Sequence, residues 1–197
     1  MTIASLSQIS HSEIPAAFIR AFSDYQIPVD ETLEEMIMAN TQRGVDYSAS
    51  FGSFSDDGAL TGFIFCGVRR EAGALMYYDG ATAVIPSWRG RGVGGLLLDK
   101  ALADAKSRGA YAFVLEVIQE NLKAQRLYES HGFSISRSLR CFQKQREDIH
   151  SMEPSDSELH APDADEFLAI AKTIVLPYTP SWQNTNASVT SIFGNLT

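Results

Sequence analysis

The stretch that decides the fold of this chain runs from Val84 to Leu98 and reads VIPSWRGRGVGGLLL. An apolar, strand-like segment ends at Pro86, which cannot continue a central strand. Two arginines among glycines follow, and the sequence then becomes helix-forming. The first N–H groups of a helix have no partner within the helix, and the helix dipole favours negative charge there. A strand, a glycine-rich turn and a helix N-terminus in this order therefore predict a site for a phosphate or pyrophosphate.

The composition is that of a globular domain with a hydrophobic core. Of the 197 residues, 45% are hydrophobic and 10% are aromatic, which is ordinary for such a domain. No apolar run approaches the ~20 residues that span a bilayer, and no export signal is visible. Cys66 and Cys141 lie far apart without metal-ligand spacing, which favours buried thiols in a reduced cytoplasm. We expect a cytoplasmic protein without a membrane partner.

The charge is unevenly distributed and divides the chain into two parts. Residues 1–146 carry a net charge of −1, whereas residues 147–197 carry −7 of the total −8. The first part has no general basic surface, so a nucleic-acid partner is not expected. Acidic residues and two prolines at the start of the second part indicate a linker or a solvated face. We therefore predict one domain over residues 1–146, followed by an acidic linker and a C-terminal extension.

The pattern of apolar residues and turns predicts a mixed α/β domain. Thr32 and Glu35 form a capping-box pattern at a helix start, and Asp56-Asp57-Gly58 indicates a hairpin turn. Strands are expected at 2–9, 48–54, 60–68, 75–85, 111–118, 133–138 and 140–144, and helices at 11–22, 32–41, 92–107 and 121–130. The apolar strand 111–118 should pair in parallel with 75–85, and Gly80 is a candidate bulge in the latter.

A dinucleotide-binding fold is the first alternative to consider. Gly90, Gly92 and Gly95 fit the spacing G-x-G-x-x-G, and Glu116 follows about 20 residues later. That fingerprint usually follows the first strand of a βαβ unit, whereas this turn follows several strands and a hairpin. The nucleoside-triphosphate P-loop is absent, because no Gly-Lys-Ser/Thr follows the glycines. Both readings are therefore disfavoured.

Two motifs, in this order, resemble those of the GNAT family, the GCN5-related N-acetyltransferases. RGRGVG, from Arg89 to Gly94, matches the family signature Q/R-x-x-G-x-G/A. The sequence from Asn121 to Phe133 matches the module N-x-x-A-x-x-L-Y-x-x-x-G-F. The resemblance is strong over residues 79–133. It implies an α/β (α+β) fold with a central, mixed, mostly antiparallel twisted sheet of about six to seven strands, flanked by about four helices.

The resemblance also implies acetyl-CoA as cofactor and transfer of its acetyl group to a primary amine. The acceptor would be a small molecule or a peptide, attacking the thioester directly in a ternary complex. By the family pattern, the backbone of the strand end meets the pantetheine arm and the acetyl carbonyl, and the turn wraps the pyrophosphate. The implied cofactor-binding residues are Val84, Ile85, Arg89, Gly90, Arg91, Gly92, Val93, Gly94, Gly95, Asn121 and Tyr128.

The resemblance suggests two catalytic residues. Tyr128 would protonate the departing sulfur, although a core aromatic of an amphipathic helix is the simpler interpretation. Asn121 is two helical turns earlier and is also a plain helix N-cap. Glu116, expected to be buried beside apolar neighbours, would act as general base through water. A carboxylate paired with an arginine explains Glu116 equally well.

Other polar residues leave the acceptor undefined. Tyr78 and Asp79 could line the amine pocket, although Asp79 also fits a turn. The acidic residues at the start of the helix at 32–41 favour a cationic amine as acceptor, but a solvated helix start explains the same charges. The histidines show no metal-ligand spacing, so no metal is expected. A non-catalytic acetyl-CoA-binding regulatory or scaffolding module is the alternative function.

Residues 147–197 are not covered by the two motifs. Apolar spacing predicts an amphipathic helix at 163–174, and a short helix at 187–193. Such a segment resembles the start of a second, truncated GNAT-like domain, or a docking arm that supports a homodimer. A simple extension packed on its own domain is the plainer interpretation. An arm predicts burial of Trp182, Ile192 and Phe193 against this chain or a partner.

Overall fold

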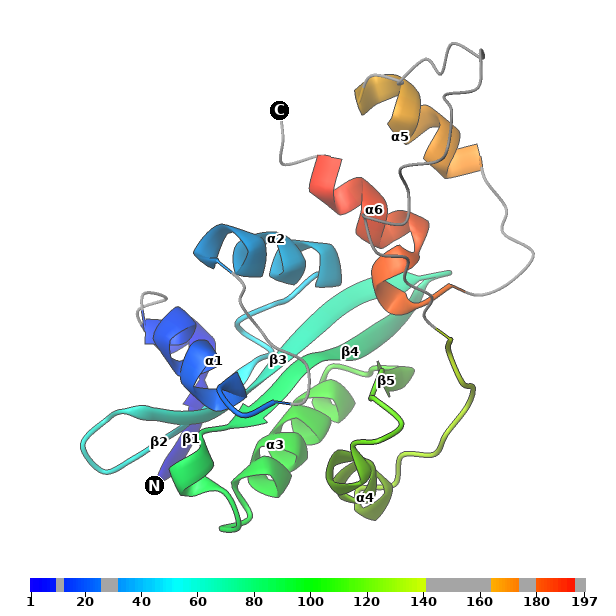
Figure 1. The fold of residues 1–197 in the computed structure, drawn as a ribbon. Coiled ribbons are helices and arrows are strands. Elements are labelled where there is room, and N and C mark those ends of the chain that lie inside the picture. The colour runs from blue at the N-terminus through cyan, green and yellow to red at the C-terminus, as the bar shows by residue number, and fades with distance from the viewer. Residues whose placement is uncertain (10–12, 26–31, 141–163, 174–179, 194–197) are drawn as a thin grey trace, which may run out of the picture.

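A computed structural model of the chain describes residues 1–9, 13–25, 32–140, 164–173 and 180–193. Its centre is a sheet of five strands in the order β1-β2-β3-β4-β5 (Figure 1). β1 to β4 are antiparallel neighbours, whereas β5 runs parallel to β4. The strands are β1 (Thr2–Ser5), β2 (Phe51–Phe54), β3 (Leu60–Glu71), β4 (Ala74–Val84) and β5 (Ala112–Leu115).

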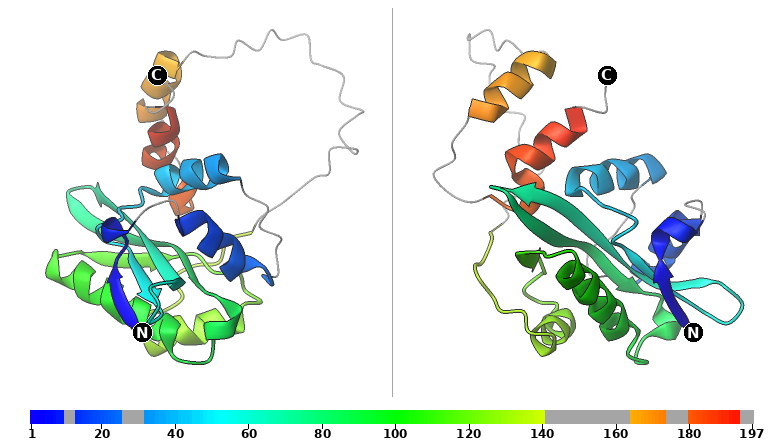
Figure 2. Two further views of the ribbon diagram at one scale, coloured as in Figure 1. Left: turned by 90° about the vertical axis from the view of Figure 1, so that its left-hand side faces the viewer. Right: turned by 180° about the vertical axis from the view of Figure 1, so that it is seen from behind.

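Helices cover both faces of the sheet, as two further views show (Figure 2). α1 and α2 pack on one face, and α3 and α4 on the other. The α-helices are α1 (Ile14–Phe22), α2 (Leu33–Arg43), α3 (Val93–Ser107), α4 (Leu122–Ser130), α5 (Ala164–Thr173) and α6 (Asn186–Phe193). The short 3₁₀ helices of the described residues are η1 (Leu6–Gln8), η3 (Pro86–Trp88) and η5 (Trp182–Asn184).

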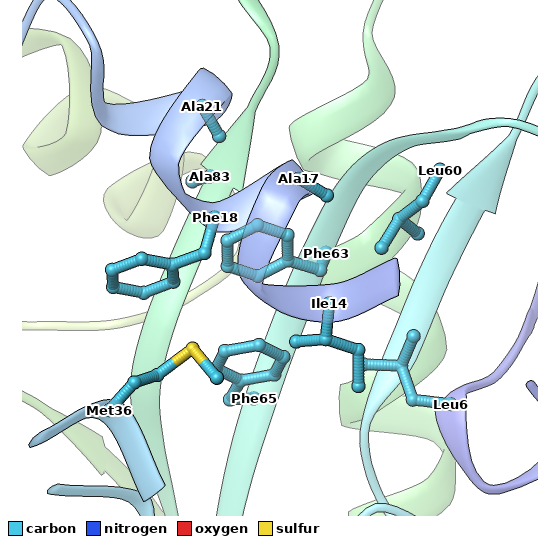
Figure 3. Close-up of a cluster of buried hydrophobic side chains, with 10 residues drawn as sticks. All are labelled: Leu6, Ile14, Ala17, Phe18, Ala21, Met36, Leu60, Phe63, Phe65 and Ala83. Atoms are coloured by element: carbon cyan, nitrogen blue, oxygen red, sulfur yellow. The ribbon is translucent and has the colours of Figure 1, made fainter. Parts of the chain in front are cut away.

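Alternating side chains of β3 supply the two cores, because successive residues of a strand point to opposite faces. Phe63 and Phe65 stack with ring centroids 4.5 Å apart and meet Phe18 of α1 (Figure 3). Ile64 and Cys66 point to the other face, into the cluster built by α3. Burial on both faces explains why this part of β3 is almost continuously apolar.

Most of the predicted elements of the first domain are confirmed. Thr32 and Glu35 form the capping box: the Thr32 hydroxyl accepts the Glu35 N–H at 3.2 Å, and the carboxylate accepts the Thr32 N–H at 2.7 Å. Gly80 is the bulge, since Asp79 and Ala81 pair with adjacent residues of β3 and Gly80 is skipped. The parallel pairing of β4 with β5 is also confirmed.

The sheet is smaller than the six to seven strands expected. Residues 133–138 form no strand, and the side chains from Ser134 to Arg140 are exposed. Phe133 packs against Phe113 and Tyr128, but residues 134–138 have no buried face, so the alternating pattern is insufficient for a strand. Residues 141–144 of the second expected strand lie outside the described residues. β1 is also shorter than 2–9, because η1 replaces its second half.

We predict that Gly67→Ala destabilises the domain strongly. A Cβ at Gly67 would lie 2.2 Å from the backbone oxygen of Arg43, where α2 ends against β3. Backbone has to move to relieve this overlap, and we expect a loss of about 1–3 kcal/mol in the free energy of unfolding.

Chemical denaturation measures this loss, with Gly80→Ala as the control. A Cβ at Gly80 would come closest, at 3.2 Å, to Cδ of the flexible Arg43 side chain. The control should therefore lose less stability than Gly67→Ala. Equal losses in the two variants would contradict the close approach at Gly67.

Candidate active site

The glycine-rich turn between β4 and α3 presents free backbone donors. Gly90 and Gly92 have φ of 75° and 77°, in the left-handed region that favours glycine. α3 begins without a side-chain cap, and its first bond runs from the Leu96 N–H to the Gly92 carbonyl at 3.1 Å. The preceding N–H groups, those of residues 93–95, have no intrahelical acceptor. This geometry fits the anion site that the sequence predicts.

The Arg89 side chain anchors the turn instead of extending towards such an anion. Its Nε donates to the Val84 carbonyl at 2.9 Å, and Nη2 donates to the Ala21 carbonyl at 2.9 Å. Both terminal nitrogens also contact the Asp24 carboxylate, at 2.6 and 2.8 Å. The hydrogen bond from Arg89 lowers the pKa of Asp24. The guanidinium of Arg91 lies over the Trp88 ring, 4.8 Å from its centroid.

The next two glycines bring α3 and α4 together. A Cβ at Gly94 would lie 3.4 Å from Leu127, and one at Gly95 would lie 3.5 Å from His131. Small residues on α3 thus permit the close approach of α4. At the start of α4, the Asn121 side chain accepts the Ala124 N–H at 3.1 Å, which confirms the predicted N-cap.

Tyr128 of α4 reaches a buried carboxyl group on β4. Its hydroxyl donates to Oδ2 of Asp79 at 3.0 Å, and the Thr82 hydroxyl donates to the same oxygen at 2.7 Å. Asp79 is 5% exposed, and its Oδ1 has no hydrogen-bond partner among the described residues. Burial raises the pKa of Asp79 to about 6, although the two hydroxyl groups favour its ionised form. Burial and the neighbouring Asp79 raise the pKa of Tyr128.

Glu116 follows β5 and faces Tyr78 of β4. Its side chain is exposed rather than buried as expected, because β5 ends at Leu115. Oε1 accepts the backbone N–H of Trp182 at 2.8 Å, and Oε2 accepts the Tyr78 hydroxyl at 3.4 Å. Burial raises the pKa of Tyr78, and the charge of the nearby Glu116 raises it further.

A cavity of about 700 Å³ joins these groups. Its lining includes Glu116, Tyr78 and Tyr128, together with Arg69 and Trp182. The glycine-rich turn does not line it, but α4 connects the two, since Leu127 packs against the turn and Tyr128 faces the cavity. The two predicted catalytic side chains thus share one cavity.

Trp182 of η5 brings the C-terminal extension to this cavity. Its ring stacks on Tyr78 with centroids 4.9 Å apart, and Cζ of Arg69 lies 3.5 Å from its centroid. Its Nε1 donates to the Arg43 carbonyl at 3.0 Å. Trp182 is 5% exposed, which confirms its predicted burial. The side chains of residues 192 and 193 lie outside the described part of the chain.

Sequence reasoning missed two features of the site. The bond of Asp79 to Tyr128 joins β4 to α4 across 49 residues of sequence, and a turn residue was an equally good interpretation of Asp79. The contact of Trp182 with Glu116 joins positions far apart in the chain, and no local pattern indicates it. An aromatic residue within an otherwise polar segment was the one available signal.

The fold is that of acetyltransferases. Two solved structures share it, the ribosomal-protein-S18-alanine N-acetyltransferase from Escherichia coli and an aminoglycoside antibiotic 6'-N-acetyltransferase from Acinetobacter haemolyticus. The first has a TM-score of 0.56 and 24% identity, over 69% of this chain and 79% of that one. The second has a TM-score of 0.54 and 17% identity, over 74% and 99%.

The chain belongs to the acetyltransferase (GNAT) family, whose model matches residues 12–133. A mycothiol acetyltransferase from Beutenbergia cavernae is 34% identical over 116 residues, which are 58% of this chain and 38% of the relative. One from Thermobispora bispora is 34% identical over 118 residues, 58% and 40% of the respective chains. The chain thus spans less than half the length of these curated relatives.

Among the described residues, no helix is both long and apolar enough for a membrane span. The His, Cys, Asp and Glu side chains of the same residues include no group of three or more that could hold a metal ion.

We predict that Trp182→Ala frees residues 182–191 from the domain. The variant loses the stacking on Tyr78 and the cation–π contact with Arg69, each worth about 1 kcal/mol. Hydrogen–deuterium exchange of these amides should accelerate at least about tenfold, while exchange in β3 and β4 stays unchanged.

Trp88→Ala is the matched control, because it removes the other tryptophan and its contact with Arg91. It should leave exchange of residues 182–191 unaltered. Unchanged exchange of these amides in Trp182→Ala would contradict anchoring of the segment by this side chain.

Proposed function

We propose that the protein is an acetyl-CoA-dependent N-acetyltransferase acting on a primary amine of a small molecule or a peptide. The main support is that Tyr128 and Glu116 line one cavity, and that α4, which carries Tyr128, also packs through Leu127 against the first turn of α3, where the N–H groups are free. Transfer to an amine requires a group that removes a proton from nitrogen and a group that protonates the leaving sulfur. The two side chains supply one group of each kind.

The residues of the turn and of β4 fit coenzyme A. β5 pairs with β4 only from Met76 to Asp79, so the described sheet leaves residues 80–84 of β4 without a neighbour on that side. This open edge suits an extended pantetheine arm beside Val84 and Ile85. The N–H groups from Gly90 to Gly95 and the charge of Arg91 suit its pyrophosphate. When bound, the thioester supplies an activated acetyl carbonyl and a thiolate leaving group.

Each catalytic side chain then has a defined task. Glu116, with one oxygen held by the Trp182 N–H and the other by Tyr78, accepts the proton of the attacking amine through water. Tyr128 donates its hydroxyl proton to the leaving sulfur. Its raised pKa keeps the phenol protonated over the physiological range.

The charges that line the cavity indicate the chemical class of the acceptor. The lining includes Glu71, which is paired with Arg69 at 2.6 Å, and Arg137. The carboxylates of Glu116 and Glu129, also in the lining, suit a cationic amine. Of the acidic residues at the start of α2, Glu35 is engaged in the capping box. The similar proteins are named for mycothiol, for an aminoglycoside antibiotic and for the alanine of a ribosomal protein.

Release of free thiol from acetyl-CoA tests the proposal, with polyamines, amino acids, aminoglycosides and peptide N-termini as acceptors. Thiol release that depends on one of these amines supports the transferase. The alternative, a regulatory or scaffolding acetyl-CoA-binding module, predicts calorimetric heat with coenzyme A and no thiol with any amine.

We also propose that the C-terminal extension is an arm docked on its own domain. Besides Trp182, the contacts are Arg69 Nη1 to the Ser188 hydroxyl at 2.7 Å, and the Ser191 hydroxyl to the Thr41 carbonyl at 3.3 Å. Both anchor α6 to the end of the domain that carries Glu116. A homodimer through this segment is the alternative, and sedimentation equilibrium separates a monomer from a dimer.

Tyr128→Phe should lower kcat by about 10²-fold, because it removes general-acid help in expelling the thiolate. The affinity for coenzyme A should change less than about twofold, since the ring remains. Steady-state kinetics and calorimetry provide the two measurements. An unaltered kcat would remove Tyr128 from the mechanism.

Gly92→Ala should weaken coenzyme A binding roughly tenfold, because strain of about 1–2 kcal/mol in the left-handed region shifts the turn. Gly58→Ala is its matched control: Gly58 has φ of 86°, and both positions leave open space for a Cβ. Both variants should lose similar stability, and only Gly92→Ala should lose affinity in calorimetry. Equal affinities would exclude the turn from the binding site.

A further inference from the structure

Asp79 is a buried carboxyl group for which the proposed mechanism has no use. It lies on β4 beside the bulge at Gly80, and the described ion pairs do not include it. A buried acid without a cation is costly in its ionised form. Its bonded oxygen accepts from Thr82 and Tyr128, and its other oxygen is buried without a partner among the described residues.

The bond between Asp79 and Tyr128 limits what Tyr128 can do. When Asp79 is ionised, the phenolic proton is directed at its Oδ2 and away from the cavity. A phenolate formed at Tyr128 would then be an anion 3.0 Å from a carboxylate. Two neighbouring buried anions repel strongly. Proton donation by Tyr128 is therefore unfavourable in this state.

We propose that Asp79 is a positioning residue that holds a reserve proton for Tyr128. This inference rests on the proposed function of Tyr128 as proton donor. With Asp79 protonated, its Oδ2–H donates to the Tyr128 oxygen, and the phenolic proton turns towards the cavity. As the carbon–sulfur bond of the thioester breaks, sulfur takes the Tyr128 proton and Tyr128 takes the Asp79 proton. Asp79 ends as a carboxylate, and a proton from solvent restores it through Tyr128 once the products leave.

The surroundings of Asp79 support this role. The titratable groups around the pair are Cys66 of β3, Tyr78 of β4 and, beside Tyr128, Tyr25 after α1. None of these three is a cation. Arg43 of α2 is the nearby cation: its charge acts on Tyr78, and its Cδ would lie 3.2 Å from a Cβ at Gly80. The described ion pairs do not join Arg43 to Asp79. Asp79 thus keeps a proton to higher pH than an exposed aspartate.

The first test uses the protein without any substrate. A folded-state pKa of about 6 against a usual 3.8 means that the folded state binds the proton more tightly. The stabilising contribution is complete below pH 3.8 and is lost as the pH rises through about 6. Between these limits, the unfolding equilibrium constant of the wild type should rise roughly 100-fold relative to that of Asp79→Asn. Parallel pH profiles of stability for the two proteins would overturn the proposal.

The second test follows kcat against pH in the full chain. The wild type should lose activity on the alkaline side as Asp79 ionises, and Asp79→Asn should lack this limb, with kcat at low pH reduced about 10- to 100-fold. Thr82→Val is the control that keeps the acid: it removes a bond that favours the carboxylate, so the limb should move to higher pH. An alkaline limb in Asp79→Asn at the wild-type position would overturn the proposal.

The two tests separate this inference from the proposed function. If the wild type releases no thiol with any amine, the transferase proposal fails, while the stability profile still reports whether Asp79 holds a proton. Thermal unfolding at pH 5 shows whether Asp79→Asn is folded. If that variant does not fold, the Thr82→Val profile decides, and an unmoved limb counts against the proposal.

Discussion

The end of the pairing between β4 and β5 is the constraint on which the rest of the site depends. The two parallel strands share a ladder only as far as Asp79 and Leu115. Beyond that point β4 continues towards the glycine-rich turn, while the chain after β5 leaves towards α4. The divergence opens one edge of β4 and places Glu116 at the mouth of the cavity. Because α3 connects the two strands, its N-terminus lies where the open edge ends.

Arg89 is a motif residue that stabilises the glycine-rich turn through contacts within the protein. Its guanidinium bonds with the Val84 and Ala21 carbonyls and with Asp24 hold the strand end, the turn and α1 as one unit. The free N–H groups that follow are donors of fixed position. A lysine at this position has three N–H donors on one nitrogen, so it could not span acceptors that Arg89 reaches from three separate nitrogens.

The elements that can be predicted from the sequence are those that local patterns determine. The capping box at Thr32, the hairpin, the bulge at Gly80 and the N-cap at Asn121 all follow from short-range rules, and the structure confirms them. The strand expected at 133–138 was wrong: Phe133 packs against the core, but the side chains from Ser134 onward are exposed. The exposure of Glu116 also differed from expectation, since it depends on where β5 ends. Contacts between distant segments, such as that of Trp182 with Tyr78, produce no periodic pattern in the sequence.

The position of Trp182 has a consequence for biosynthesis. Its partners Arg43, Arg69 and Tyr78 are made more than a hundred residues earlier. When these residues leave the ribosome, the ring of Tyr78 and the carboxylate of Glu116 therefore lack their contacts with Trp182. Trp182 can make these contacts only after residue 182 has been synthesised. The order of synthesis therefore lets the contacts of Trp182 form only after the sheet residues that it touches have been made.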